Sequence, residues 1–285
     1  MTKRKIGVLG AGTWGMALAR MLTVSGNEVQ VWSAIEAEVD NLSAARVHPN
    51  LPGMKIPAEL QFTKSMEEVC TGKDVLLFAV PSVFVRSTTA KARPYIPDGQ
   101  IIVDVAKGME PDTLYTMTEV IADELNKEGG PKNYKLVALS GPTHAEEVAL
   151  DLPTTIVSAC PDDEAARFVQ DVFSNTCMRV YTNPDIKGVE LSGALKNVIA
   201  LGVGISTGLG YGDNARAALI TRGIAEIARL GVAMGCNIHT FAGLAGIGDL
   251  IVTATSMHSR NNRAGILIGK GESPEQAVKE VGMVV

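Results

Sequence analysis

Histidine, cysteine and aromatic residues are scarce in this sequence, and positive charge is not in excess. The 26 lysines and arginines are outnumbered by 31 aspartates and glutamates, which leaves a net charge of −5. Nucleic acids and anionic membrane surfaces are bound through basic stripes, so we expect neither as a partner. The four cysteines form no CxxC pair and no cysteine–histidine cluster. This spacing predicts reduced thiols in a cytoplasmic protein and no metal site.

Long hydrophobic runs are also missing. The most apolar stretch, residues 195–209, contains Lys196 and Asn197 and is too short to span a bilayer, so no integral membrane segment is expected. The N-terminus imitates a secretory leader, because a basic start and an apolar run precede Ala17-Leu-Ala19. Three glycines at fixed spacing inside that run favour a strand, a turn and a helix instead.

Short apolar strands alternate with helical segments through most of the chain. Residues 5–9, 14–22 and 29–32 predict a βαβ unit. Further strands are expected at 75–80, 101–105, 136–139, 155–159 and 179–182, and helices at 35–45, 83–92, 114–128 and 165–173. This alternation predicts an α/β fold with a Rossmann-like, doubly wound, mostly parallel sheet.

The strand pattern stops after Pro184. Helices are expected at 186–205, 215–234 and 273–281, joined by glycine-rich connections. We therefore predict a Rossmann domain over residues 1–184 and an all-helical, substrate-binding and catalytic domain over residues 185–285, with the active cleft between them.

A glycine-rich motif follows the first strand and opens the first helix. Gly10, Gly12 and Gly15 fit GxGxxG, in which the glycines permit a tight turn, an approach to a pyrophosphate and close helix packing. FAD enzymes and methyltransferases use similar loops, so the motif alone favours NAD or NADP without fixing it. The second strand ends at Trp32-Ser33, without the usual ribose-binding carboxylate and without an arginine for a 2′-phosphate. Ser33 could bind either form, so the choice between NAD and NADP stays open.

Other strand ends should line the same crevice. Phe84 lies just beyond one of them, where it could pack against the cofactor or belong to the core. Lys107, followed by Gly108, lies beyond the next and is either a ligand or a surface charge. Ser140-Gly-Pro-Thr143 follows a third strand and precedes a helix start at His144.

Seven motifs, in one order along nearly the whole chain, resemble those of the bacterial NAD(P)-dependent glycerol-3-phosphate dehydrogenases. They are GAGTWG at 10–15, AKG at 106–108, SGPT at 140–143, GALKNV at 193–198, NARAALITRG at 214–223, GLAGIGDL at 243–250 and SRNNR at 259–263. Such a series is far more specific than any one motif.

The resemblance implies that Lys196 accepts the proton when sn-glycerol 3-phosphate is oxidised to dihydroxyacetone phosphate. Substrate contacts are implied at Lys107, Gly141, Thr143, Lys196, Asn197, Asp249, Ser259, Arg260 and Asn261. Cofactor contacts at Thr13, Trp14, Phe84, Lys107, Ala145, Arg260 and Val284 are implied in addition to Gly10, Gly12, Gly15 and Ser33.

The family is typically dimeric and cytoplasmic and supplies glycerol 3-phosphate for phospholipid synthesis, which the resemblance implies here too. The chain departs from the family at two places. Ala34 stands where relatives often carry arginine, histidine or an aromatic residue, which alters the adenosine end of the site. The chain stops at Val285, where relatives continue with a glutamate and a further helical segment, so a C-terminal truncation is expected.

Oxidising a secondary alcohol requires a base beside the hydride acceptor. His144 is the best placed of the four histidines, but it is better interpreted as a helix-start residue. Lys196 interrupts an apolar helix on the face that also carries Ser192 and Gly193, which would leave room for a substrate, although a lysine extending from a partly buried helix to solvent has the same pattern. We expect burial and the like charge of Lys107 to favour the neutral amine, and Asp249 to orient it while partly opposing that shift.

The substrate phosphate requires multidentate donors. Arg260 and Asn261, expected on a short loop, offer a guanidinium and an amide, whereas a solvated turn is the alternative. Rival functions are a 3-hydroxyacyl-CoA or ketopantoate dehydrogenase on the same plan, which lacks support from a histidine–glutamate pair, a nucleotide-sensing module, which would need neither lysine, and an impaired fragment.

Overall fold

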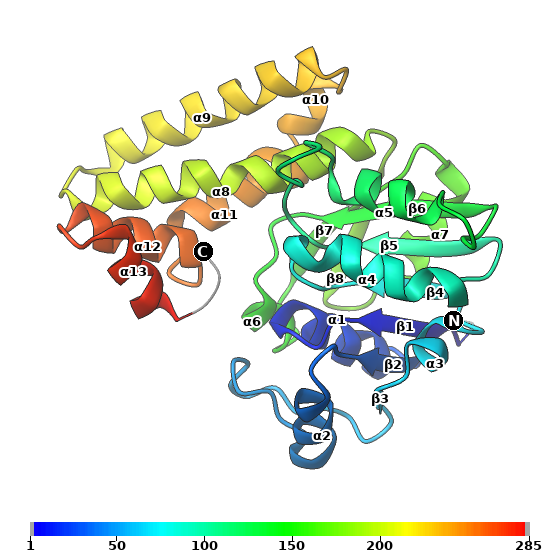
Figure 1. Ribbon diagram of the computed structural model, residues 1–285. Helices are drawn as coiled ribbons and strands as arrows, with labels where there is room; N and C mark the ends of the chain where they lie inside the picture. The colour runs from blue at the N-terminus through cyan, green and yellow to red at the C-terminus, as the bar shows by residue number, and fades with distance from the viewer. Residues whose placement is uncertain (1–2, 283–285) are drawn as a thin grey trace. The chain divides into compact units, whose positions relative to one another are not determined.

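The chain is described by a computed structural model that covers residues 3–282 (Figure 1). It divides into two compact units. Unit 1 comprises residues up to 139 together with 144–186, and unit 2 comprises residues 140–143 together with 187 onward. The predicted functional division at residues 184 and 185 stays a prediction, because a compact unit is not by itself an independent domain.

Unit 1 is built on one sheet of eight strands in the order β3-β2-β1-β4-β5-β6-β7-β8. The strands are β1 (Lys5–Leu9), β2 (Glu28–Trp32), β3 (Gln61–Thr63), β4 (Val75–Phe78), β5 (Gln100–Asp104), β6 (Tyr134–Ser140), β7 (Thr154–Ala159) and β8 (Met178–Asn183). The neighbours from β3 through to β6 pair in parallel, as do β7 and β8. The predicted Rossmann-like, mostly parallel sheet is confirmed.

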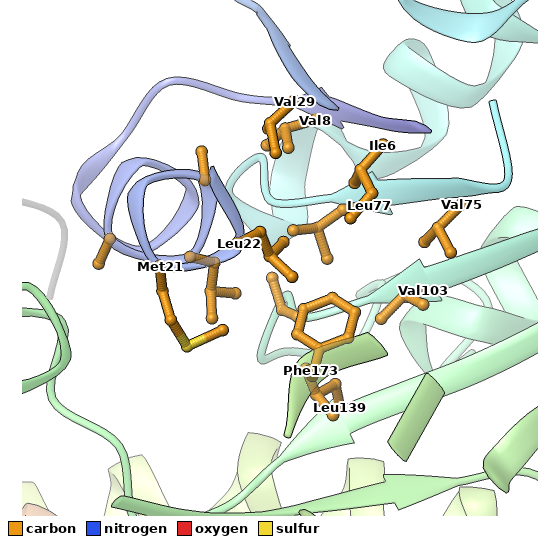
Figure 2. Close-up of a cluster of buried hydrophobic side chains, with 14 of the residues drawn as sticks. Ile6, Val8, Met21, Leu22, Val29, Val75, Leu77, Val103, Leu139 and Phe173 are labelled. Carbon is orange, nitrogen blue, oxygen red and sulfur yellow. The ribbon is translucent and has the colours of Figure 1, made fainter. Parts of the chain in front are cut away.

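Alternate residues of each central strand belong to two different cores. Val75 and Leu77 of β4 contribute to the cluster shown in Figure 2, whereas Leu76 and Phe78 contribute to the other. Helices cover both faces of the sheet, so β4 is buried on both sides and reads as an unbroken apolar run. Unit 1 contains α1 (Thr13–Val24), α2 (Glu36–Ala45), α3 (Met66–Cys70), η1 (Ser82–Phe84), α4 (Val85–Ala92), η2 (Arg93–Tyr95), α5 (Met117–Leu125), α6 (Ala145–Val148) and α7 (Asp163–Phe173).

The helix predicted over residues 114–128 is shorter at both ends than expected. Leu114 has a φ of 58°, which an α-helix cannot contain, and α5 begins only at Met117. The carboxylate of Glu119 accepts a hydrogen bond of 2.9 Å from the backbone N–H of Thr116, which fixes the start of the helix. The sequence analysis also missed β3 and α3, which are too short to show a period.

Unit 2 is helical. Its elements are α8 (Ile186–Gly208), α9 (Asp213–Ala233), α10 (Ile238–Phe241), a π-helical turn η3 (Leu244–Gly248), α11 (Asp249–Thr255), α12 (Arg260–Gly269) and α13 (Pro274–Val281). The predicted all-helical C-terminal region is confirmed. The connections expected between the predicted helices contain α10, η3, α11 and α12, which are short and glycine-rich and therefore gave no helical signal.

Glycines bring the backbones of α8 and α12 into direct contact. A Cβ added to Gly204 would lie 2.3 Å from the carbonyl oxygen of Asn262, and one added to Gly265 would lie 2.3 Å from that of Leu201. Gly208 and Gly269 repeat the arrangement one turn further along. Residues 186–208 and 238–255 are each long and apolar enough to cross a membrane by length and composition, but they are the partly buried core helices of unit 2.

Candidate active site

The glycine-rich turn of unit 1 shows which of its glycines the protein itself requires. Gly10 has a φ of 122°, and a Cβ there would lie 2.7 Å from the carbonyl oxygen of Ala79. A Cβ on Gly15 would lie 2.3 Å from the carbonyl oxygen of Gly10. Gly12 is different, because it is exposed and a Cβ there would meet nothing within 4 Å. The space over Gly12, at the N-terminus of α1, fits the approach of a dinucleotide pyrophosphate.

The predicted cofactor residues of unit 1 follow neighbouring strands. Because β2, β1, β4 and β5 are parallel neighbours, their carboxyl ends meet at one edge of the sheet, and the segments after them carry Ser33, Gly10, Phe84 and Lys107. The backbone N–H of Gly10 donates to the carbonyl of Trp32 at 2.8 Å, which ties the glycine turn to the end of β2. This edge is where open α/β sheets bind nucleotides.

The side chain of Phe84 is 56% exposed, so the alternative that it belongs to the core is wrong. Gly108 allows the turn after β5 to approach the turn after β4, since a Cβ there would lie 2.6 Å from the Cβ of Ser82. Thr13, Trp14 and Ala145 are partly buried, and Trp14 and Ala145 pack against the core of unit 1. Val284 lies outside the described residues.

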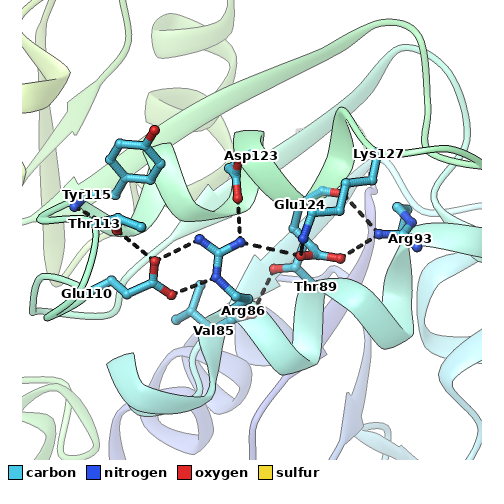
Figure 3. A network of polar contacts seen from close by, with 10 residues as sticks. All are labelled: Val85, Arg86, Thr89, Arg93, Glu110, Thr113, Tyr115, Asp123, Glu124 and Lys127. Carbon is cyan, nitrogen blue, oxygen red and sulfur yellow. Dashed lines mark hydrogen bonds and ion pairs between the residues drawn. The ribbon is translucent and has the colours of Figure 1, made fainter.

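The loop that carries Lys107 is anchored by a network of ionic contacts (Figure 3). Arg86 of α4 makes a two-pronged contact with the carboxylate of Glu110, at 2.6 and 2.7 Å, and reaches Asp123 of α5 at 2.5 Å. The guanidinium of Arg86, assisted by the hydroxyl of Thr113, lowers the pKa of Glu110 to about 2. Glu110 is three residues from Lys107, so this network fixes the end of the loop.

Lys196 of α8 is buried in unit 2 with 6% of its surface exposed. Its Nζ donates to Oδ1 of Asp249 at 2.5 Å and to Oγ1 of Thr253 at 2.6 Å. The Thr253 hydroxyl in turn donates to the backbone carbonyl of Asp249 at 2.7 Å. The alternative that Lys196 extends to solvent is wrong. The structure places Asp249 beside the amine, as predicted, and adds a hydroxyl that the sequence analysis missed.

Thr253 went unnoticed because α11 itself was not predicted. Once α11 is recognised, the four-residue spacing from Asp249 to Thr253 places both on one face of the helix, which was the available signal. The turn η3 immediately before α11 is π-helical, and its backbone bond from the N–H of Gly248 to the carbonyl of Gly243 spans five residues.

The segment predicted to bind substrate after β6 also belongs to unit 2. A Cβ on Gly248 would lie 3.7 Å from Pro142, so this segment packs at the start of α11, next to Asp249. The hydroxyl of Thr143 donates to the carbonyl of Gly141 at 3.2 Å, which closes a tight turn. Asn197, next to Lys196 on α8, is partly buried.

Arg260 and Asn261 do not lie on a short loop, and that prediction was wrong. They are the first two residues of α12, which Ser259 caps by accepting a bond of 3.2 Å from the backbone N–H of Asn262. The buried amide of Asn262 donates to the carbonyl of Ala254 at 2.8 Å and joins α12 to the end of α11. Arg260 is exposed, and the positive end of the helix dipole adds to its charge.

Family models and individual relatives agree on what the chain is similar to. A model described as the NAD-dependent glycerol-3-phosphate dehydrogenase N-terminus matches residues 5–166, and the corresponding C-terminus model matches residues 185–285. The chain belongs to this family. The predicted resemblance is thereby confirmed, and the acyl-CoA and sensor alternatives are not needed.

Relatives within the family cover nearly all of the chain. A glycerol-3-phosphate dehydrogenase [NAD(P)+] 2 of Lactobacillus delbrueckii subsp. bulgaricus is 71% identical over 281 residues, which are 99% of this chain and 83% of that protein. The Agathobacter rectalis relative, a glycerol-3-phosphate dehydrogenase [NAD(P)+], is 50% identical over 99% of this chain and 82% of its own length. The crystal structure of the Coxiella burnetii glycerol-3-phosphate dehydrogenase matches with a TM-score of 0.93 at 36% identity, covering 99% of this chain and 85% of that one.

Proposed function

We propose that this chain interconverts sn-glycerol 3-phosphate and dihydroxyacetone phosphate, with Lys196 as the group that transfers the proton. As a member of its family the chain is an oxidoreductase that uses NAD(P). The buried contact of the Lys196 amine with Asp249 and Thr253 carries the proposal, because an ammonium buried for structural reasons alone would be costly.

The geometry supports the acid form of Lys196 in particular. The carboxylate of Asp249, 2.5 Å away, stabilises the ammonium, which is the form that polarises and protonates the oxygen of a ketone. In the reverse direction the same nitrogen receives the proton of the alcohol. The bound nicotinamide supplies or accepts the hydride.

Arg260 and Asn261 are the proposed phosphate ligands. Their position at the first turn of α12 combines a guanidinium, an amide and the backbone N–H groups of a helix N-terminus, all of which favour a dianion. We propose Lys107, Gly141, Thr143, Asn197 and Ser259 as further substrate contacts. The glycine-rich turn of unit 1, with the open space over Gly12, would hold the pyrophosphate of the cofactor.

We further propose that the enzyme is a cytoplasmic homodimer that supplies glycerol 3-phosphate for phospholipid synthesis. The ammonium form of Lys196 favours reduction and therefore glycerol 3-phosphate as the product. Leu219, Leu230 and Val232 of α9 are large apolar side chains that stay exposed in the single chain, which supports contact with a second copy.

The test is the reduction of dihydroxyacetone phosphate, followed as loss of the nicotinamide absorbance at 340 nm. Lys196→Ala is expected to lower kcat by about a hundredfold or more while the far-UV circular dichroism stays unchanged. Lys270→Ala, which removes an exposed lysine of the same unit, is the matched control and should leave kcat unchanged. A folded Lys196→Ala variant with normal turnover would contradict the mechanism.

A further inference from the structure

The end of β2 is the place in a Rossmann unit where the adenosine ribose of the cofactor binds. In this chain that point is fixed by the hydrogen bond between the N–H of Gly10 and the carbonyl of Trp32, at 2.8 Å. Ser33 follows directly and is 7% exposed. The groups around Ser33 therefore decide whether the ribose bears a 2′-hydroxyl, as in NAD, or a 2′-phosphate, as in NADP.

The Ser33 hydroxyl is committed to a carboxylate. Its Oγ donates to Oε2 of Glu38 at 2.5 Å and accepts a bond of 3.2 Å from the backbone N–H of Ile35. A hydroxyl has a single proton, so the proton of Ser33 is already given to Glu38 and cannot be donated to a phosphate. Glu38, the third residue of α2, thus brings a negative charge to the end of β2.

Glu38 also lies close to the glycine-rich turn. Nε2 of His48 bonds to the carbonyl of Ala11, between Gly10 and Gly12, at 3.2 Å. Burial lowers the pKa of His48, and the charge of Glu38 partly offsets this. The carboxylate is therefore near both Ser33 and a side chain that contacts the cofactor turn.

The cation that the sheet register brings beside Ser33 is already neutralised. Trp32 of β2 pairs with Thr63 of β3, so Lys64 is the residue next to Ser33 across the strands. The Lys64 ammonium bonds to Asp40 at 2.8 Å and contacts Glu36 at 3.6 Å. Three carboxylates of α2 thus face one ammonium, and the surroundings of the ribose carry net negative charge.

We propose that Glu38, held by Ser33, accepts the adenosine ribose hydroxyls and repels a 2′-phosphate, so that this chain prefers NAD to NADP. This inference rests on the proposed function only in taking a nicotinamide dinucleotide as the cofactor. The motif at the end of β2 does not reveal it, because the carboxylate lies six residues after Trp32 and returns to the strand end through the first turn of α2.

Titration calorimetry of the full chain with ADP-ribose and with 2′-phospho-ADP-ribose tests the proposal, because these probes differ only in the phosphate. The unmodified chain is expected to bind ADP-ribose about tenfold more tightly or better. Glu38→Gln, which removes the charge but keeps the shape, should reduce that ratio to about threefold or less. Ser33→Ala should also reduce it, because Glu38 loses its hydrogen bond.

Glu36→Gln is the matched control. It removes the same charge two residues away, Glu36 makes no contact with Ser33, and Lys64 keeps its shorter bond to Asp40. It should leave the ratio nearly unchanged. Equal affinities in the unmodified chain, or an equal loss in Glu36→Gln, would overturn the proposal. Binding of neither probe would overturn it together with the cofactor assignment, whereas a failure of the Lys196 chemistry would appear only in the turnover assay.

Discussion

At the scale of single residues, the active-site lysine depends on two oxygens of one helix. Removing an ammonium from water costs several kcal/mol unless charge and hydrogen bonds compensate for it. Asp249 supplies the charge and Thr253 supplies a second acceptor, while Thr253 also bonds back to the carbonyl of Asp249. The three groups therefore hold one another in place, and Thr253 acts as a positioning residue.

Thr253→Ala is expected to lower kcat by about tenfold and to change KM for dihydroxyacetone phosphate much less. The physical reason is that a hydrogen bond to a charged group, worth about 1.5–3 kcal/mol, is lost at the amine. Steady-state kinetics with each variant measures both constants. Thr253→Ser keeps the hydroxyl and should recover most of the activity.

Thr255→Ala is the control on the same helix, because Thr255 is exposed and its hydroxyl bonds only to the carbonyl of Ile251. It should behave like the unmodified enzyme. If Thr253→Ser were as slow as Thr253→Ala, the hydroxyl would not be what orients Lys196.

At the scale of elements, the start of α12 is positioned by backbone contact with α8. Gly204→Ala would force a methyl group to within 2.3 Å of the carbonyl of Asn262, so the helices must separate. We expect a loss of about 1–3 kcal/mol in the free energy of unfolding, measured by urea denaturation. Because Arg260 begins α12, KM for the phosphorylated substrate should rise as well.

Gly202→Ala provides the contrast within the same helix. A Cβ at Gly202 meets nothing within 4 Å, and alanine is favoured over glycine inside a helix. This variant should be stabilised by up to about 1 kcal/mol with KM unchanged. Destabilisation of both variants to the same extent would show that close packing of α8 and α12 is not the cause.

The network that joins α4 to α5 makes stability depend on pH. The pKa of Glu110 is lowered from 4.5 to about 2 by Arg86 and Thr113, so its carboxylate stabilises the fold above pH 4.5. This contribution is lost as the pH falls from 4.5 towards 2. After allowance for the partial exposure of Arg86, we expect it to be about 1 kcal/mol.

Urea unfolding at pH 6 and pH 3 measures this contribution. Glu110→Gln should lose less stability between the two pH values than the unmodified chain, because it has no carboxylate to protonate. Glu128→Gln, at an exposed position beyond α5, should follow the unmodified chain. Parallel curves for all three proteins would rule out the network as the source of the pH dependence.

At the scale of the whole molecule, the sequence predicted the elements that have a strong period. The apolar runs of β1, β4 and β5 and the long helices α8 and α9 were located within a few residues. The short helices α10, α11 and α12 were missed because glycines and tertiary contacts, not local pattern, define them. Consequently Lys196 and Asp249 could be predicted from motifs, whereas Thr253 and the helical setting of Arg260 required coordinates. Glu38 was missed for a related reason, since its contact with Ser33 depends on how α2 folds back.

The proposed dimer predicts a mass of about twice 30.1 kDa in sedimentation equilibrium. Leu230→Glu places a charge on the exposed apolar surface of α9 and should shift the protein towards the monomer. Val24→Glu, at a similarly exposed position in unit 1, is the control. A protein that stays monomeric at micromolar concentration would contradict this assignment.

The π-helical turn before α11 means that chain length, and not only residue identity, specifies the catalytic apparatus. Each residue of an α-helix advances the side-chain direction by about 100°. Deleting one residue from Leu244–Gly248 would therefore turn α11 on its axis and carry Asp249 and Thr253 away from the amine together, although neither had been replaced. A homologue that retains every functional side chain but differs by one residue in this turn would have a different proton-transfer geometry.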